Sequence, residues 1–484
     1  MLDVIIIGAG VIGCAIAQRL GEYQGSFMVI DKAYDVSEGA SKANSGIVHA
    51  GYDAKPGSEK ARLNVKGAKM MPALCQKLGV PYGQPGALVL GFKEEDRAVL
   101  EDLLHNAQLN GVEGCRLIDR DEILKMEKHI NQDVLLALYV PASGLVSPYD
   151  LTCALADSAG ENGVLFQLDT AVERVSFKDG AWQIKTSRGL FMARAVVNCA
   201  GVGADIIHNQ ISSRQVNISA RRGQYYLLDR SLTLPFNRTL FQVPTAMGKG
   251  VLVSPTTHGN LLLGPTAEDI GDKSDTATTA LGLRDILQKV GLTYPEVDLR
   301  NVITTFSGLR AHEKNGDFII GQVEGASGPG AFEAIGIESP GLSAAPAIGE
   351  ELGDWVAYSL SLGRNLDYIA PTPLPKPFSG MNEAERRAAF ENDPDYGRVI
   401  CRCEQVTEAE VRRAIRRPVG ARTLDGVKRR TRAGMGRCQG GFCSTRVMQI
   451  LSEELGIGMD EVTKFGGDST ILSGGIREAG TDAE

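Results

Sequence analysis

Short apolar runs alternate with glycine-rich turns at the start of the chain. Residues 1–31, MLDVIIIGAGVIGCAIAQRLGEYQGSFMVID, begin with a β-branched run that leads into Gly8-x-Gly10-x-x-Gly13. The apolar residues that follow recur at helical spacing, and a second apolar run, FMVI, ends at Asp31. This order predicts a strand, a tight turn, a helix and a second strand, which is the context in which a GxGxxG motif binds a dinucleotide.

Each residue of this motif has a physical task in a dinucleotide site. Gly8 makes the tight turn, Gly10 lets a pyrophosphate approach the backbone at the helix N-terminus, and Gly13 lets helix and strand pack closely. Asp31 follows the glycines by about 20 residues, where an acidic side chain binds a ribose hydroxyl group. The alternative is a βαβ unit with an incidental glycine turn. The motif alone does not separate NAD from FAD.

Alternating apolar and polar residues predict β-strands in the middle of the chain. The strands are expected within residues 170–201, with a hairpin at Asp179-Gly180, and within residues 220–230 and 250–269, as parts of an antiparallel sheet. Residues 340–360 predict a helix after a Ser-Pro-Gly turn. The N-terminus of that helix would direct a positive dipole end toward a bound cofactor.

The sequence changes in character after residue 369. The stretch APTPLPKPFSG is proline-rich and cannot form a long helix or a central strand. Thr407 and Glu410 then form a capping box, and two further helices are expected within TLDGVKRRTR and CSTRVMQILSEELG. The final glycine-rich residues predict a loosely packed or disordered tail. We therefore divide the chain into residues 1–370, a linker at 371–394 that separates two sites, a small helical module at 395–456 and a tail at 457–484.

Length and charge narrow the class of protein. A chain of 484 residues predicts two or three domains. The net charge of −8 argues against nucleic-acid binding as the main role. The N-terminus does not read as a signal peptide, and no apolar run has the length of a membrane span. These features favour a cytoplasmic protein with reduced thiols.

Four cysteines of the C-terminal module form a CxC…CxxxxC pattern, with members Cys401, Cys403, Cys438 and Cys443. Structural zinc sites with four cysteines usually use CxxC pairs separated by about 15 to 20 residues. Here one pair is CxC and the spacer is longer. A [2Fe–2S] cluster also takes four cysteines, two on each iron. The pattern favours such a cluster over zinc or four unrelated thiols.

Basic residues dominate the same module. Only four acidic residues stand between Arg402 and Arg446. The cations would favour the reduced, more negative form of an all-thiolate cluster. A solvated helix face and a surface that docks on an acidic partner are the alternatives.

Four further stretches carry a resemblance to known enzymes: residues 44–62, NSGIVHAGYDAKPGSEKAR; 196–205, VVNCAGVGAD; 306–321, FSGLRAHEKNGDFIIG; and 336–352, GIESPGLSAAPAIGEEL. Together they resemble the glycine-oxidase/D-amino-acid-oxidase superfamily of FAD enzymes over residues 1 to about 370. Within it they are similar to FAD-linked glycerol-3-phosphate dehydrogenases and L-2-hydroxyglutarate dehydrogenases. The stretch GMGRCQGGFC resembles the bacterioferritin-associated-ferredoxin-like [2Fe–2S] domain that is fused to anaerobic-type glycerol-3-phosphate dehydrogenase and to some amine dehydrogenases.

The resemblance implies an α/β fold, α+β overall. A Rossmann-like FAD-binding domain is interleaved with an antiparallel-sheet substrate domain, and a small helical [2Fe–2S] domain follows. It implies a cluster on the four cysteines of the module. It also implies that FAD is contacted by Gly8, Gly10, Gly13, Asp31, Lys32, Ser41, Asn44, Ser45, Gly46, Val172, Ala200, Gly201, Gly308, Ser339, Gly341 and Leu342.

Two side chains are the candidates for catalysis. His49, in GIVHAGY, stands where the motif of the family runs beside the flavin, and histidine suits a base that takes a hydroxyl proton. Arg310, in SGLRAHE, matches the anion-binding arginine of the family, and its planar fork fits phosphate or carboxylate. A hydrogen-bonded structural histidine and a structural ion pair are the alternatives. Lys249 and His258 are weaker candidates, and His312 would share a strand face with Arg310.

The resemblance implies oxidation of sn-glycerol 3-phosphate to dihydroxyacetone phosphate. A flavin accepts two electrons as hydride and a cluster carries one, so electrons would leave singly for a redox partner protein or a second flavoprotein subunit. Peripheral membrane association would then come through the partner. Residues 41–57 are at least as similar to the hydroxyglutarate branch, so L-2-hydroxyglutarate or another 2-hydroxy acid is an alternative. An amine or amino-acid dehydrogenase subunit and a pure electron-transfer subunit are further alternatives.

Overall fold

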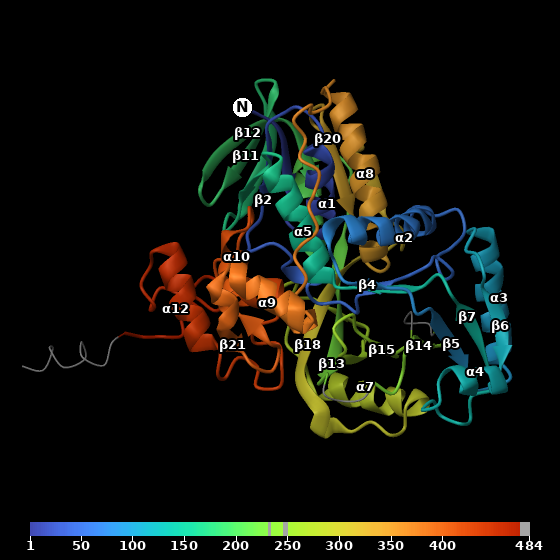
Figure 1. Ribbon diagram of the computed structural model, residues 1–484. Coiled ribbons are helices and arrows are strands. Elements are labelled where there is room, and N and C mark those ends of the chain that lie inside the picture. The colour runs from blue at the N-terminus through green and yellow to red at the C-terminus, as the bar shows by residue number, and fades with distance from the viewer. Residues whose placement is uncertain (231–233, 245–249, 475–484) are drawn as a thin grey trace, which may run out of the picture.

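The computed structural model describes residues 1–230, 234–244 and 250–474. Figure 1 shows a sheet with helices against it at the top, a second sheet below, and a helical module of C-terminal residues beside both. Three long helices cover the first sheet: α1 (Val11–Leu20), α5 (Pro148–Glu161) and α8 (Gly341–Ser359). The fold is thus the mixed α/β fold expected from the sequence.

The first sheet has a parallel core in the order β9-β2-β1-β12-β20. Its strands are β1 (Leu2–Ile7), β2 (Phe27–Ile30), β9 (Leu165–Gln167), β10 (Val172–Lys178), β11 (Ala181–Thr186), β12 (Gly189–Asn198), β19 (Ile319–Gln322) and β20 (Ala331–Ile335). Residues 4–7 of β1 are buried on both faces, which explains their continuous apolar run. The predicted order of strand, turn, helix and strand is confirmed.

The predicted hairpin is also confirmed. β10 and β11 pair antiparallel and are joined by Asp179 and Gly180, which have φ angles of 53° and 77°. Positive φ at both central residues is the geometry of a two-residue hairpin turn, and an Asp-Gly pair adopts it readily.

The second sheet is mostly antiparallel, as the middle of the chain predicts. Its strands are β5 (Ala87–Gly91), β6 (Arg116–Asp119), β7 (Leu136–Val140), β13 (Ile218–Leu228), β14 (Thr239–Gln242), β15 (Leu252–Pro255), β16 (Leu261–Gly264), β17 (Glu268–Ile270) and β18 (Val302–Glu313). β13 and β18 pair from Ile218–Glu313 to Leu228–Val302, whereas β14 and β5 pair parallel. Around the sheet lie α3 (Asp96–Leu109), α4 (Arg120–Met126) and α7 (Ala280–Thr293).

The remaining elements of this part of the chain are the long helix α2 (Glu59–Leu78), the helix α6 (Ala204–Ile211), the short strands β3 (Ile47–Val48), β4 (Tyr82–Gly83) and β8 (Gly144–Val146), and the 3₁₀ turns η1 (Gly39–Ser41), η2 (Gly201–Gly203) and η3 (Leu299–Asn301). β8 pairs with both β3 and β4, and α2 packs along α8. This arrangement brings residues 41–50 between the two sheets.

The C-terminal module has a core of its own. Its elements are β21 (Val399–Cys401), β22 (Val406–Thr407), α10 (Glu408–Arg416), α11 (Leu424–Thr431) and α12 (Ser444–Leu455). Val411, Val427 and Ile450 are fully buried within it. The predicted capping box of Thr407 and Glu410 is present at the start of α10.

The expected linker is not uniformly irregular. It contains η4 (Phe378–Gly380), helix α9 (Glu383–Asn392) and the start of η5 (Pro394–Gly397). Asn382 and Glu385 form a second capping box, a signal that the sequence contained. The division of the chain at residues 370, 394 and 456 stays a prediction.

The expected tail is partly attached to the module. Val462 is buried in the core of the module, and Lys464 pairs with Asp425 at 3.0 Å. Residues 471–474 are exposed, and residues 475–484 lie outside the described residues. Within the part of the chain that the structure describes, no helix is both long and apolar enough to cross a membrane.

Candidate functional site

A cavity of about 1320 Å³ lies where the two sheets and the C-terminal module meet. With the exception of Gly13, every residue predicted to contact the cofactor lines this cavity. His49 and Arg310 line it as well. The structure therefore brings together residues that are up to 334 positions apart between Gly8 and Leu342.

The glycines at the start of α1 leave no room for side chains. A Cβ atom on Gly8, where φ is 114°, would lie 2.3 Å from the carbonyl oxygen of Cys199. A Cβ atom on Gly13 would lie 1.9 Å from the carbonyl oxygen of Gly8, so Gly13 acts by packing rather than by lining the cavity. Gly8, Gly10 and Val11 line the cavity, so the turn before α1 and the start of this helix face it, as a cradle for a pyrophosphate requires.

Asp31 holds the glycine turn in place. Its carboxylate accepts hydrogen bonds from the backbone N–H groups of Ala9 (2.6 Å) and Ala33 (2.8 Å). Burial raises the pKa of Asp31, and these two N–H groups oppose that shift. Its predicted contact with a ribose hydroxyl group stays a prediction.

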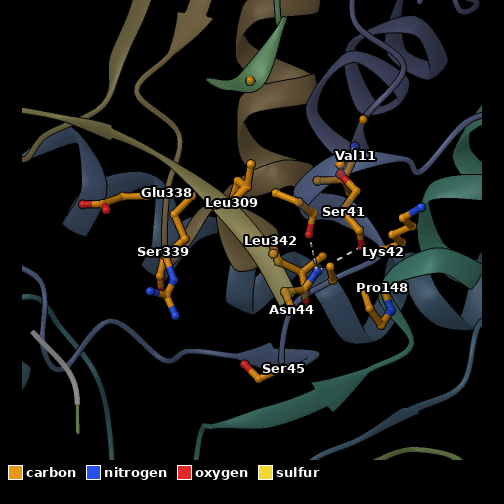
Figure 2. A pocket seen from close by; sticks show the side chains of 18 of the residues that line it. Val11, Ser41, Lys42, Asn44, Ser45, Pro148, Leu309, Glu338, Ser339 and Leu342 are labelled. Atoms are coloured by element: carbon orange, nitrogen blue, oxygen red, sulfur yellow. Dashed lines mark hydrogen bonds between the residues drawn. The ribbon is translucent and has the colours of Figure 1, made fainter. Parts of the chain in front are cut away.

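The loop after η1 forms one wall of the cavity (Figure 2). The Asn44 side chain donates to the carbonyl oxygens of Ala40 and Ser41, both at 3.0 Å, and accepts from the Gly46 N–H at 2.8 Å. Ser41 Oγ accepts from the Val11 N–H at 2.9 Å, which attaches the loop to the N-terminus of α1. These bonds fix the loop next to the first turn of that helix.

Strand β18 touches the same loop from the other side. A Cβ atom on Gly308 would lie 2.0 Å from the carbonyl oxygen of Ala43, so only glycine permits this approach. α8 begins at Gly341 and contributes Gly341 and Leu342 to the cavity. A cofactor ring bound between β18 and α8 would face the N-terminus of α8, as the sequence predicts.

His49 is buried, with 6% of its surface exposed, and its ring lies 5.6 Å from that of Phe241. Its backbone is fixed on two sides. Its N–H donates to Ser343 Oγ at 2.8 Å, and its carbonyl oxygen lies 2.8 Å from the side-chain amide of Asn64, oriented to donate. Such a frame fixes the point from which the imidazole leaves the main chain beside the cavity.

Arg310 extends from β18 into the cavity and is partly buried. Its guanidinium is 3.4 and 3.5 Å from the Thr266 carbonyl oxygen, which are long contacts. A Cβ atom on Gly223 would lie 2.6 Å from Arg310 Nη2, so this glycine makes room for the guanidinium.

Of the weaker candidates in the described residues, one lines the cavity and one does not. His258 lines the cavity and its Nε2 lies 3.2 Å from Asp150 Oδ2. His312 shares β18 with Arg310, but its Nδ1 lies 3.1 Å from Glu338 Oε2 and it is not part of the cavity lining. Burial would raise the pKa of Glu338, but Lys60 and His312 outweigh it and lower the pKa. Lys249 lies outside the described residues.

The four module cysteines come together in two loops. The Sγ atoms of Cys401 and Cys403 are 3.7 Å apart, those of Cys403 and Cys438 are 4.0 Å apart, and Cys443 contacts Cys401. Burial and Cys401 raise the pKa of Cys403 to about 12. Backbone N–H groups of its own loop outweigh burial and lower the pKa of Cys438.

The four sulfurs lie next to one another in the order Cys443, Cys401, Cys403 and Cys438. Two thiolates for each of two irons is the ligand set of a [2Fe–2S] cluster.

The module closes the cavity, which the sequence did not predict. Asp425, Lys428, Arg429, Arg432, Met435 and Gln439 all line it. The linker therefore does not keep the two sites apart, and this expectation was wrong. The reason is that ion pairs between distant segments hold the module against the first sheet.

Asp35 is the centre of these ion pairs. It is 2% exposed, and its oxygens lie 2.6 and 2.7 Å from Arg430 Nη1 and Nη2 in a bidentate pair. Arg429 Nη2 lies 3.0 Å from Asp35 Oδ2 and 2.7 Å from Glu38 Oε1. Burial would raise the pKa of Asp35, but Arg430 and Arg429 outweigh it and lower the pKa.

Arg432 connects the cysteine loops to the cavity. Its Nε lies 2.8 Å from Glu404 Oε2, next to Cys403 in the chain. Its Nη atoms donate to the hydroxyl of Tyr149 and to Asn260 Oδ1, both at 3.1 Å. Arg432 thus links the module to α5, which carries Tyr149, and to the turn between β15 and β16, which carries Asn260.

Comparison with known protein families divides the chain in two. Residues 3–355 match the family described as FAD dependent oxidoreductase. Residues 399–453 match the family described as BFD-like [2Fe-2S] binding domain. The first match covers the two sheets, and the second covers the cysteine module.

Individual proteins resemble the chain over much of its length. A glycerol 3-phosphate dehydrogenase of Caloramator mitchellensis is 44% identical over 98% of this chain and 98% of that protein. The structure of an FAD-bound L-α-glycerophosphate oxidase from Mycoplasma pneumoniae aligns with a TM-score of 0.72 and 30% identity, over 78% of this chain and 99% of that one. An L-2-hydroxyglutarate dehydrogenase of Arabidopsis thaliana is 26% identical over 73% of this chain and 83% of that protein.

Proposed function

The chain belongs to the FAD dependent oxidoreductase family, and we propose that it oxidises sn-glycerol 3-phosphate to dihydroxyacetone phosphate. Its cofactors are FAD and a [2Fe–2S] cluster. The open glycine turn of α1 and the paired thiols fit these two groups. Electrons would leave through the cluster to a separate redox protein.

The observation that supports an anionic substrate is an arginine without a counter-ion, and the 44% identity to a glycerol 3-phosphate dehydrogenase favours a phosphate. Most of the partly or fully buried lysines and arginines of the cavity have a carboxylate within ion-pair distance. Among the described residues, Arg310 and Lys428 are the two that have none. A partly buried guanidinium without a carboxylate favours binding of an anionic ligand. Arg310 and His49 line the same cavity, so we assign Arg310 the phosphate of the substrate.

The proposed chemistry needs one base and one anion clamp. Bound FAD supplies the acceptor for a hydride from the carbon that carries the hydroxyl group. Arg310 binds the phosphate and thereby orients this carbon, and His49 takes the hydroxyl proton as the ketone forms. The fixed backbone of His49 supports this role, because a base must stay within hydrogen-bond reach of its proton.

L-2-Hydroxyglutarate is the second candidate, favoured by the similarity to the Arabidopsis thaliana dehydrogenase. Its carboxylates also fit a guanidinium. Anaerobic titration of the purified holoenzyme, observed at the flavin absorption band, tests the proposal. Bleaching by glycerol 3-phosphate at low concentration supports it, and bleaching by L-2-hydroxyglutarate or an amino acid alone contradicts it.

Replacing Arg310 with lysine should weaken substrate binding about 10- to 100-fold, with a smaller loss of the limiting reduction rate. Lysine keeps the charge but loses the bidentate fork, a difference of one or two strong hydrogen bonds. The concentration dependence of anaerobic flavin reduction separates the two effects. Arg284→Lys, at an exposed position on α7, is the matched control. An unchanged substrate affinity in Arg310→Lys would remove Arg310 from the site.

The cluster loops support an exit for electrons. Gln439 lines the cavity, whereas Cys438 and Phe442 of the same loop are exposed, Phe442 to 88%. One short loop thus runs from the cavity to the surface. We propose that the redox partner binds where this loop reaches solvent.

Replacing Cys438 with serine should remove the cluster and stop turnover with a one-electron acceptor. Reduction of bound FAD by substrate should continue, because His49 and Arg310 belong to the other part of the chain. Iron and sulfide analysis should fall from about two of each per chain. Cys115→Ser, at a partly buried thiol on the outer edge of the second sheet, is the control and should keep its cluster. Full acceptor turnover without iron would contradict the proposed electron route.

A further inference from the structure

We propose that Lys428, from helix α11 of the cluster module, completes the FAD site by binding the pyrophosphate of the cofactor. The FAD site would then be built by both parts of the chain. This inference rests on FAD as the cofactor and is independent of the substrate.

Lys428 lacks a counter-ion where one is expected. Its side chain lines the cavity and is partly buried, and no carboxylate of the described residues lies within ion-pair distance of its Nζ. Burial lowers its pKa; Asp425 opposes this shift, and Lys464, Arg429 and Lys42 add to it. A partly buried ammonium among other cations is unfavourable unless an anion joins it. The cavity in front of it is the space for that anion.

The position of Lys428 identifies which anion this is. Its neighbour Arg429 lies 2.7 Å from Glu38 Oε1, and Glu38 pairs with Lys42. Lys42 follows Ser41, whose Oγ accepts from the Val11 N–H at the start of α1. Figure 2 shows Val11, Ser41 and Lys42 on the same side of the pocket.

The N-terminus of α1 is where a pyrophosphate meets backbone N–H groups. Lys428 therefore belongs to the end of the cavity formed by the glycine turn. Arg310 lines the cavity from β18 of the second sheet, where its guanidinium lies beside the Thr266 carbonyl oxygen. The two partly buried cations without counter-ions thus fit two different phosphates, one from the cofactor and one from the substrate.

The experiment measures FAD binding and the pyrophosphate directly. Apoprotein that retains its cluster is titrated with FAD, and binding is followed by quenching of flavin fluorescence. Lys428→Gln should weaken FAD binding roughly 10- to 100-fold, as expected for one charge-assisted hydrogen bond, and Lys428→Arg should restore most of it. In the FAD-loaded protein, the ³¹P resonances of the pyrophosphate should shift in Lys428→Gln.

Arg422→Gln is the matched control, because Arg422 is exposed on the same module and does not line the cavity. It should bind FAD as the unmodified chain does and leave the ³¹P resonances in place. FAD affinity of Lys428→Gln within about threefold of the control, with unshifted resonances, overturns the proposal. Weaker binding with unshifted resonances also overturns it, because Lys428 would then act on the docking of the module instead of on the phosphate.

Discussion

Replacing His49 with alanine should slow reduction of the flavin by substrate by roughly two to four orders of magnitude, the contribution typical of a positioned general base. The side chain lines the cavity with Arg310, and its main chain is held by Ser343 and Asn64. Because these contacts involve the backbone, alanine keeps them and removes the imidazole alone. Substrate affinity should change less than the rate, since Arg310 remains. Stopped-flow reduction under anaerobic conditions measures both.

Glycerol 3-phosphate and L-2-hydroxyglutarate should be compared side by side in this experiment. His105→Ala is the matched control, because His105 is exposed on α3 and does not line the cavity. Reduction of His49→Ala at the rate of the unmodified chain would mean that another group takes the proton. His258 would then be the next histidine to replace, because it lines the cavity and His312 does not.

Local patterns in the sequence predicted the elements of the fold well. The glycines at positions 8, 10 and 13 indicated the strand, turn and helix because their spacing follows from contacts within a single βαβ unit. The Asp179-Gly180 hairpin and the Thr407 capping box follow from contacts between residues no more than a few positions apart. Arg310 and His49 were predicted through family resemblance, and the structure brings them to one cavity.

The docking of the module could not be predicted in this way. Asp35 and Arg430 are 395 positions apart, and no periodicity links them. The excess of arginine was a signal, and one interpretation was an acidic docking partner. Part of that partner is in the same chain, because Arg429 and Arg430 meet Asp35 and Glu38. Other arginines of the module have internal partners: Arg412 and Arg416 pair with Glu454.

The same docking explains why the predicted independence of the two sites fails. Lys428 and Gln439 of the module line the cavity beside residues of the first sheet. Gln439 stands next to Cys438 in the chain, so the proposed transfer of electrons from flavin to cluster would need no large domain movement. On this proposal, the ion pairs of Asp35 would bear on electron transfer as well as on stability.

Replacing Arg430 with glutamine should weaken the docking of the module by about 3 to 5 kcal/mol. This is the loss typical when a buried ion pair loses one partner. The Arg430 side chain is fully buried, and it donates to Asp35 and also to the Val419 carbonyl oxygen at 2.7 Å. Glutamine is too short to replace this fork, and Asp35 keeps the ion pair to Arg429 and the hydrogen bond from the Val36 N–H. Urea unfolding followed by flavin fluorescence and by cluster absorbance should then show two separate transitions in place of coincident ones.

Arg416→Gln is the matched control for this prediction, because Arg416 is exposed on the same module and its partner Glu454 keeps a second pair with Arg412. Such surface pairs contribute about 0 to 1 kcal/mol, so its unfolding should stay close to that of the unmodified chain. The double variant Asp35→Leu/Arg430→Met removes both charges and should recover much of the loss, because the desolvation cost of an unpaired carboxylate disappears with it. Unfolding of Arg430→Gln that matches the Arg416→Gln control would show that the buried pair does not hold the module. The contacts of Arg417 with Asp157 and of Arg432 with Tyr149 would then have to supply the docking energy.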